Sequence, residues 1–175
     1  MSKDPKELFP RLAQVGVVVR DLEASMKHYE AILGIKPHRV IERSPTGEGK
    51  KYYYGKESDF FQKVALYQLG EVEFELLEPF GGDSVLMDFL RTHGEGIHHV
   101  AFDTGDFAGV REHFEAHDIP LAQTGPTSRH PAMRWGFFDT VKELGTTIEV
   151  FNALEVARIE AGKANEKDGS PSRGS

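Results

Sequence analysis

Four polar residues lie inside otherwise apolar stretches of this 175-residue chain, at positions that match between its two halves. A shift of 85 residues places Gln14 over His99, and a shift of 74 places Glu75 over Glu149. Burying two carboxylates without partners is unfavourable, and a divalent cation would remove that penalty. Imidazole nitrogen and carboxylate or amide oxygen are all competent metal ligands. We therefore predict a divalent metal ion bound by these four residues.

The shift of 85 residues also aligns longer segments, which indicates an internal repeat. His28-Tyr-Glu-Ala lies over His113-Phe-Glu-Ala, and Asp21 lies over Asp106. Each half predicts a strand, a helix that begins at one of these aspartates, and two or three further strands. We expect an α+β fold in which paired βαβββ modules form an open, barrel-like mixed sheet around a central cleft. Equivalent residues of the two modules would then face this cleft.

Strand parity and the repeat together select the residues that face the cleft. Neighbours in a strand point to opposite faces, so His98 and His99 should diverge, and the repeat selects His99. Predicted strands cover residues 15–19, 63–69, 71–77, 100–104, 135–139 and 146–151. A helix over Val85–Thr92 connects the halves. The segment Ile41–Phe61 contains Pro45 and several glycines, and we interpret it as a loop.

These patterns divide the chain into three parts. Residues 1–10 are an N-terminal extension, and residues 11–152 are the functional domain. Within this domain, 11–81 is the first module, 82–94 is the linking helix and 95–152 is the second module. Residues 153–175 comprise a weak helix over Ala153–Ala161 and a polar tail, which we predict to be disordered from Gly162 onward.

The composition excludes several classes of protein. Acidic residues outnumber basic ones by 28 to 21, which argues against a general nucleic-acid-binding surface. No apolar run reaches the roughly 18 residues that cross a bilayer, and the first residues do not resemble a secretory signal. Cysteine is absent, so there is no disulfide framework and no thiolate metal site. We expect a cytoplasmic protein that acts on a small molecule, without a nucleic-acid or membrane partner.

Three motifs resemble those of the vicinal oxygen chelate superfamily: Gly94–Phe102 (GEGIHHVAF), Phe74–Pro79 (FELLEP) and Gly145–Phe151 (GTTIEVF). This superfamily contains glyoxalase I, methylmalonyl-CoA epimerases, extradiol dioxygenases and antibiotic-resistance binding proteins, and the local resemblance is strongest to the epimerases. It covers about Leu12–Asn152. The resemblance implies metal ligands on equivalent strands, in the order Gln14 (usually His in the superfamily), Glu75, His99 and Glu149. It also implies a homodimer.

The predicted ligand set suits proton abstraction beside a carbonyl. Two open positions on an octahedral ion would chelate two substrate oxygens and stabilise the developing enolate. Zn, Co, Ni, Mn and Mg all suit such oxygen-rich coordination, and the sequence does not choose among them. The resemblance implies that Glu149 is the base. The epimerases take a second acid or base from the strand before the second ligand, where this sequence offers Lys63 and Tyr67 but no glutamate. His130 lies in a loop where the superfamily often places substrate-contacting groups.

The leading hypothesis is a metal-dependent epimerase or isomerase of an acyl-CoA or a related α-acidic compound. A glyoxalase I-type lactoylglutathione lyase is the first alternative, because the Gln-Glu-His-Glu set resembles that of some glyoxalase I enzymes. The second is a metal-free protein that sequesters a planar ligand with Tyr52–Tyr54 and Trp135. The segment Thr46–Phe61 is either a lid over the substrate or a solvated hairpin.

Overall fold

The first half of the chain, in a computed structural model that describes residues 4–45, 49–127 and 130–168, begins with a short helix and continues through six strands. Its long helix begins where Asp21 accepts a hydrogen bond from the Ala24 N–H and ends at Gly34 in the left-handed conformation (φ 70°). In chain order the elements are α1 (Pro5–Leu8), β1 (Arg11–Val18), α2 (Leu22–Leu33), β2 (Arg39–Ser44), β3 (Tyr52–Tyr53), β4 (Lys56–Glu57), β5 (Phe60–Leu69) and β6 (Val72–Gly81).

The second half repeats this order without an equivalent of the β3–β4 hairpin. Asp106 caps its first long helix in the same way that Asp21 caps α2, by accepting the N–H of the residue three positions on. The elements are α3 (Val85–Thr92), β7 (Gly96–Asp103), α4 (Phe107–Glu115), β8 (Leu121–Pro126), β9 (Arg134–Phe138), α5 (Val141–Leu144), β10 (Thr147–Phe151) and α6 (Ala153–Asp168).

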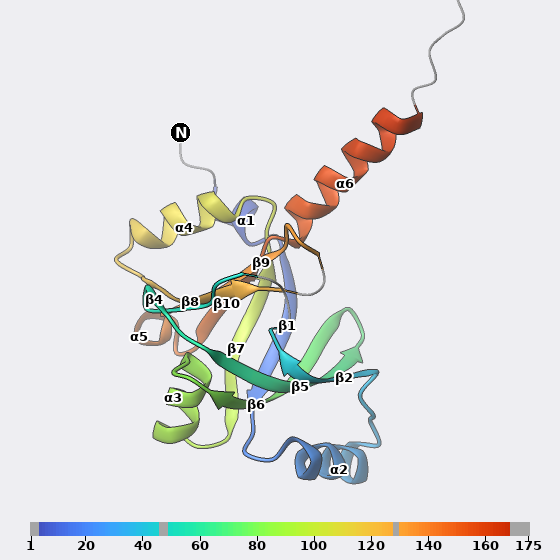
Figure 1. Cartoon of the computed structure of the whole chain (residues 1–175), viewed down its shortest axis with the longest axis vertical. Helices are drawn as coiled ribbons and strands as arrows, with labels where there is room; N and C mark the ends of the chain where they lie inside the picture. The colour runs from blue at the N-terminus through green and yellow to red at the C-terminus, as the bar shows by residue number, and fades with distance from the viewer. Residues whose placement is uncertain (1–3, 46–48, 128–129, 169–175) are drawn as a thin grey trace, which may run out of the picture.

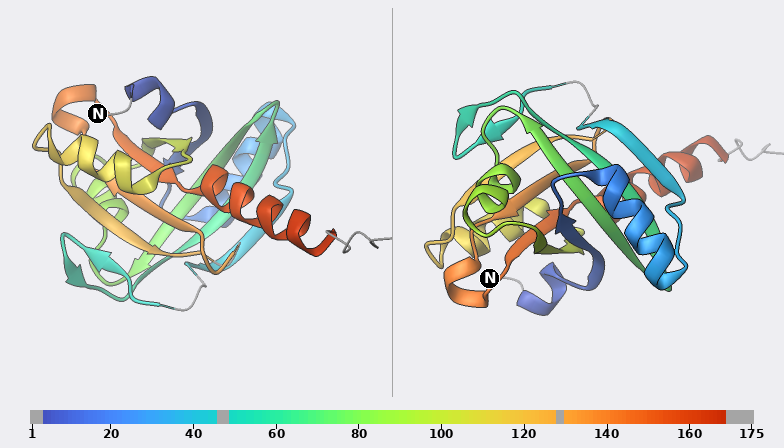
Figure 2. Two further views of the ribbon diagram at one scale, coloured as in Figure 1. Left: turned by 90° about the horizontal axis from the view of Figure 1, so that it is seen from above. Right: turned by 90° about the horizontal axis from the view of Figure 1, so that it is seen from below.

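All ten strands belong to one sheet, ordered β2-β5-β6-β1-β7-β10-β9-β8-β3-β4. Apart from β3 and β4, which extend one edge, the order is symmetrical about the antiparallel pair β1–β7, and each central strand pairs in parallel with the last strand of its own half. The sheet curls into an open trough (Figures 1 and 2). This confirms the predicted α+β fold, in which two βαβββ halves form an open, barrel-like mixed sheet.

Each half covers the outer face of its strands with its own helix. In the first half, Met26 and Tyr29 of α2 pack on a cluster that includes Tyr67 and Leu76. In the second half, Val110 and Phe114 of α4 pack with residues of β9 and β10. A third cluster joins β5, β6 and β9 with α3, and it includes Val64, Leu66, Leu77, Trp135 and Phe137. The outer faces are therefore closed separately, and the two halves share the inner face.

Two sequence predictions about irregular segments are wrong. Ile41–Phe61 is not simply a loop, because β2 continues to Ser44 against β5, and β3 adds to the edge of β8. Residues 46–48 of that segment lie outside the described residues. The helix α6 runs to Asp168, beyond the predicted end at Ala161, because Ala, Glu and Lys are strong helix formers and outweigh the single Gly162. Figure 1 shows α6 projecting away from the sheet.

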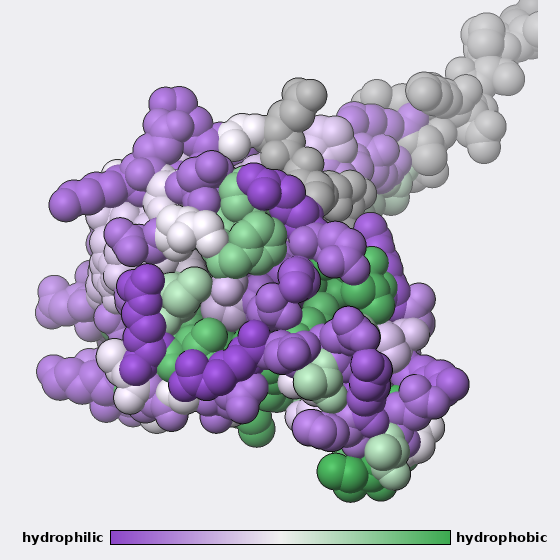
Figure 3. Space-filling view, turned by 60° about the horizontal axis from the view of Figure 1, so that its bottom comes forward, coloured by the Kyte–Doolittle hydropathy of each residue, from purple (hydrophilic) through white to green (hydrophobic). Residues whose placement is uncertain are grey.

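The surface is mainly polar in the view of Figure 3, with apolar side chains in separate patches. Ile32 and Leu33, at the end of α2, are among the most exposed apolar side chains. Within the part of the chain that the structure describes, no helix combines the length and apolarity needed to span a bilayer.

Candidate active site

A cleft opens on the concave face of the sheet and is lined by both halves of the chain. Three of its polar residues are buried on the central strands, and its walls are mainly aliphatic and aromatic. Arg39 contributes the one cationic side chain among the described residues that line it. The lining includes Gln14, Glu75 and Glu149 with Gln62, Val64, Leu66, Leu77, Trp135 and Phe137.

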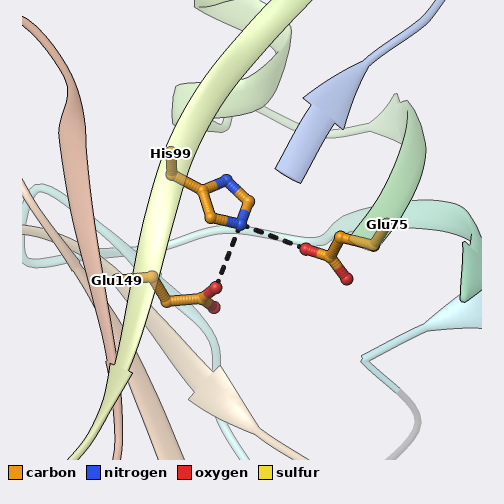
Figure 4. A group of neighbouring side chains, drawn as sticks. All are labelled: Glu75, His99 and Glu149. Carbon is orange, nitrogen blue, oxygen red and sulfur yellow. Dashed lines mark hydrogen bonds and ion pairs between the residues drawn. The ribbon is translucent and has the colours of Figure 1, made fainter. Parts of the chain in front are cut away.

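At the centre of the sheet, two carboxylates approach one imidazole nitrogen. His99 Nε2 lies 3.1 Å from Glu75 Oε1 and 3.2 Å from Glu149 Oε2 (Figure 4). One potential ligand atom from each residue lies within 4.8 Å of the others, and all three residues are buried. Glu75 comes from β6, His99 from β7 and Glu149 from β10. Two carboxylates and an imidazole of this spacing could hold a metal ion.

Gln14 lies beside this group and connects it to a further carboxylate. Its side-chain N–H donates to Glu73 Oε1 (2.7 Å) and to Glu75 Oε2 (2.9 Å). Its own carbonyl oxygen is buried and accepts no hydrogen bond. A buried amide oxygen without a donor is unfavourable, so this atom is well suited to a cation. The structure therefore brings together all four of the predicted ligands, Gln14, Glu75, His99 and Glu149.

Register explains why these side chains meet. In one row across the central strands, Gly16 of β1 pairs with Glu75 and with His99. In the next row of the same face, Ala101 of β7 pairs with Gln14 and with Glu149. Each row thus has a very small residue on one central strand, and the larger polar side chains extend over it.

Gly16 is required by space rather than by backbone conformation. A Cβ atom built there would lie 2.0 Å from His99 Cε1 and 2.3 Å from its Nε2. No backbone shift relieves such an overlap without displacing the imidazole. The His99 ring therefore lies directly over Gly16, in space that any larger residue would fill.

The β1–β7 pair carries one bulge in each strand, at equivalent positions of the repeat. The register skips Ala13 on β1 and His98 on β7, and these residues are 85 positions apart. A bulge interrupts the alternation of side chains. The expectation that His98 and His99 diverge is therefore wrong, because their Nδ1 atoms lie 3.1 Å apart.

The carboxylates and the imidazole change one another's affinity for protons. Burial disfavours the imidazolium, but the charges and hydrogen bonds of Glu149 and Glu75 outweigh it and raise the pKa of His99 to about 9. Burial raises the pKa of Glu75, and the attraction of His99 opposes this. Protons thus occupy the space between these groups in the absence of a cation, and a divalent ion would take their place.

The residues fit a divalent metal ion on three observations. Three potential ligand atoms converge, the Gln14 carbonyl oxygen is buried without a donor, and the two carboxylates supply the charge that balances a doubly positive ion. Carboxylate, amide and imidazole donors suit Zn, Co, Ni, Mn or Mg.

Comparison with known proteins identifies the family of the chain. The family model for the glyoxalase/bleomycin resistance protein/dioxygenase superfamily matches residues 13–137, which is most of the chain. The chain belongs to this superfamily. Its motifs had already indicated this relationship.

The individual relatives match only about half of the chain, at about 30% identity. An uncharacterized protein of Bacillus subtilis, YqjC, is 33% identical over 92 residues, which are 53% of this chain and 56% of that protein. A mitochondrial methylmalonyl-CoA epimerase of Mus musculus is 29% identical over 101 residues, 57% of this chain and 49% of the relative. The chain thus spans about half the length of the curated relatives it matches.

A solved structure shows the same fold. Streptomyces coelicolor methylmalonyl-CoA epimerase, in complex with 2-nitronate-propionyl-CoA, matches with a TM-score of 0.60 and 22% identity. The match covers 82% of this chain and 96% of that one. The curled sheet of this protein is therefore the fold of these epimerases.

Two of the predicted catalytic residues of this superfamily member lie on the outer face of β5. Lys63 forms an ion pair with Glu78 at 2.8 Å, and Tyr67 is buried in the cluster beneath α2. Neither lines the cleft. Leu66 pairs with Glu75, and Gln62 lines the cleft with it, so the even-numbered residues of β5 face inward. The structure therefore does not bring Lys63 or Tyr67 to the ligand set.

The other predicted substrate contacts also lie away from the cleft. His130 Nε2 is 3.5 Å from Glu160 Oε1 on α6, and His130 does not line the cleft. The hydroxyl of Tyr53 donates to Asp88, and that of Tyr54 donates to Asp139. These tyrosines attach the β3–β4 hairpin to the second half of the chain.

Sequence reasoning missed three residues that shape the site. Gly16 gives the His99 ring its space, Glu73 contacts Gln14, and Gln62 reaches the cleft from β5. The parity shared by Glu73 and Glu75 was a usable signal for the second. The first and third depend on strand pairing, which the sequence alone does not show.

Proposed function

We propose that this protein is a metal-dependent enzyme that removes the proton beside the carbonyl of an acyl-CoA or a related α-acidic compound, and so epimerises or isomerises it. The observation that carries the proposal is the convergence of Gln14, Glu75, His99 and Glu149 on the floor shared by both halves. The names of two of the similar proteins, which are methylmalonyl-CoA epimerases, support the substrate class.

Gln14, Glu75, His99 and Glu149 would hold the metal ion. A divalent ion bound there would stabilise the negative charge that develops on a carbonyl oxygen when the neighbouring carbon loses its proton. These four residues are buried, and the exclusion of water around them strengthens such electrostatic interactions.

Glu149 is our first candidate for the base. Its Oε2 atom is buried and lies 3.2 Å from His99 Nε2. Epimerisation needs a second acid or base on the other side of the substrate carbon. Glu73 is our candidate, because it accepts a hydrogen bond from Gln14 and lines the neighbouring cavity that shares Gln14 with the cleft. It replaces Lys63 and Tyr67, which lie on the outer face of β5, and His130, which lies against Glu160 of α6.

The cleft walls fit a substrate that has an apolar part and an anionic part. Val64, Leu66 and Trp135 offer an apolar surface to an acyl chain. Arg39 would pair with a carboxylate or phosphate at the same cleft, because guanidinium binds such groups with two parallel hydrogen bonds.

Solvent deuterium exchange tests the proposal. Protein loaded in turn with Zn, Co, Ni, Mn or Mg is incubated in D₂O with a panel of 2-substituted acyl-CoA thioesters, and the α-carbon is followed by NMR. We expect exchange with at least one metal and substrate, and its loss after chelation. Absence of exchange in every loaded sample, with metal bound, would overturn the proposed function.

A glyoxalase I-type lyase is the second candidate. The cleft face of β5 carries Gln62 instead of an acid, and a reaction that uses a single base on one substrate face requires no acid there. Thiol-dependent turnover of methylglyoxal would favour this reaction over epimerisation.

Two further predictions are tested by solution measurements. A metal-free sequestering protein would contain no stoichiometric metal. This alternative has less support because Tyr52–Tyr54, which were expected to stack on the ligand, do not line the cleft.

The homodimer implied by the superfamily stays a prediction, which light scattering after size-exclusion chromatography will test.

A further inference from the structure

A second histidine contacts the candidate metal ligand from behind. His98 Nδ1 lies 3.1 Å from His99 Nδ1, on the side of the ring opposite the Nε2 atom that faces Glu75 and Glu149. The His98 ring packs edge-on against Phe89 and Phe137, with centroids 5.1 and 5.5 Å away. It is 4% exposed, so its orientation is fixed by packing.

The repeat shows that the backbone does not require a histidine here. His98 is the bulged residue of β7, and the bulged residue at the equivalent position of β1 is Ala13. Both bulges form, although only one carries a ring. The residue after Ala13 is Gln14, whose amide has no tautomers, whereas the residue after His98 is an imidazole that has two. The bulged residue is thus a histidine only where the predicted ligand that follows it, His99, can carry its ring hydrogen on either nitrogen.

An imidazole that binds a metal through Nε2 must carry its hydrogen on Nδ1. That N–H needs an acceptor, because a buried donor without a partner is unfavourable. Among the described residues, His98 Nδ1 is the partner that the structure gives to His99 Nδ1. An imidazole whose hydrogen lies on Nε2 accepts at Nδ1, and the buried His98 ring presents its Nδ1 atom to His99.

We propose that His98 is a positioning residue whose Nδ1 accepts the Nδ1–H of His99 and thereby keeps His99 Nε2 available to a metal ion. The proposal rests on the metal centre of the proposed function. It concerns the ligand's tautomer and orientation, and His98 itself does not contact the substrate.

Metal affinity of three variants tests it. His98→Phe keeps an aromatic ring between Phe89 and Phe137 but removes the acceptor, and we expect Zn²⁺ affinity measured by calorimetry to fall about 10–100-fold. His98→Asn places an amide oxygen near the position of Nδ1 and should retain more of the affinity. Val110→Ala is the control for lost packing, because Val110 lies in the separate buried cluster beneath α4. It should lower the melting temperature and leave Zn²⁺ affinity unchanged.

NMR separates this inference from the proposed function. In ¹⁵N-histidine-labelled wild-type protein without metal, we expect a scalar coupling across the hydrogen bond between the two Nδ1 atoms. Absence of that coupling, or wild-type Zn²⁺ affinity in folded His98→Phe, would overturn the role of His98 while the metal centre stands. Failure of the wild-type protein to bind Zn²⁺, Co²⁺, Ni²⁺, Mn²⁺ or Mg²⁺ would overturn the metal centre and this inference with it, even if the coupling is present.

Discussion

Apart from the β3–β4 hairpin, the two halves of the chain have the same order of elements but different side chains at the centre of the sheet. Both have the order strand, helix and further strands, and each has a bulge at the same position of its first strand. In the first half this bulge precedes Gln14, and in the second half it precedes His99. Two strand positions further on, Gly16 corresponds to Ala101. The repeat thus sets where side chains meet, and a few substitutions determine what they can do.

The outer strands of the site have kept their symmetry. Glu75 on β6 and Glu149 on β10 are equivalent, and both approach the same imidazole nitrogen. Because the ring belongs to one half only, it leans over the glycine of the other. A duplicated fold can thus form one ion site when two equivalent carboxylates flank a single imidazole. Substitutions that make the two halves more alike or more different test this interpretation.

The largest effect is expected when the halves are made alike at the ligand. His99→Gln gives both strands an amide, which removes the one imidazole nitrogen that both carboxylates approach. Metal affinity should fall by more than the 10–100-fold that is typical for loss of an outer partner, and activity should fall below detection. Calorimetric titration with Zn²⁺ and the deuterium-exchange assay measure the two effects.

The converse substitution, Gln14→His, is the matched control. It gives both halves an imidazole, and the superfamily usually has His at this position. Metal binding should be retained or strengthened, because imidazole is a stronger ligand than an amide oxygen. Equal losses in the two variants would contradict the different roles assigned to the two strands.

The next effect distinguishes Glu149 from Glu73. Glu149→Gln should reduce the rate of α-proton exchange by about 10²–10⁴-fold, the usual contribution of a general base. Glu73→Gln should preserve exchange of the proton that Glu149 removes but slow inversion of the carbon. Chiral analysis alongside deuterium incorporation separates the two rates. If Glu73→Gln slows both equally, Glu73 does not serve the opposite face.

A smaller effect is expected from filling the space under the imidazole. Gly16→Ala places a methyl group within 2.3 Å of His99 Nε2 in the present geometry, so the ring must move. We expect Zn²⁺ affinity to fall about 10-fold or more while the circular dichroism spectrum is retained, by analogy with other changes that misplace a ligand. Gly162→Ala on α6, where an added methyl meets nothing, is the control. Unchanged affinity in Gly16→Ala would contradict the crowding.

The smallest effect concerns the hairpin that only the first half has. Tyr53→Phe removes the hydrogen bond to Asp88, and the free energy of unfolding should fall by about 1 kcal/mol. This bond, with burial, raises the pKa of Tyr53 from 10 to about 12. Its contribution is therefore complete below pH 10 and is lost as the pH rises through 12. Urea titrations of both proteins at pH 8 and above pH 11 should show the difference shrinking.

Part of this architecture was readable in the sequence because duplication preserves register. Matching the halves selected Gln14, Glu75, His99 and Glu149, and the structure places them together. Lys63 and Tyr67 were selected from the family resemblance instead, and they lie on the outer face of β5, because no repeat partner indicated the parity of that strand. Its parity follows from its pairing with β6 across the turn at Gly70, in which Leu66 lies opposite Glu75.

Other features depend on contacts too distant to leave a local pattern. The strands β3 and β4 are too short to show an alternation of apolar residues, and β3 forms by pairing with β8 in the other half. The bulge at His98 is equally invisible in the sequence, because only the pairing of β7 with β1 reveals the extra residue.

The most direct test of the metal centre is the metal content of the protein purified without chelator. Wild-type protein and His99→Gln are analysed side by side by inductively coupled plasma mass spectrometry. We expect one divalent transition-metal or magnesium ion per chain in the wild type and none in the variant. A wild-type protein without metal, even after incubation with each candidate ion, or equal metal in both proteins, would contradict the proposal that the two halves converge on a single ion.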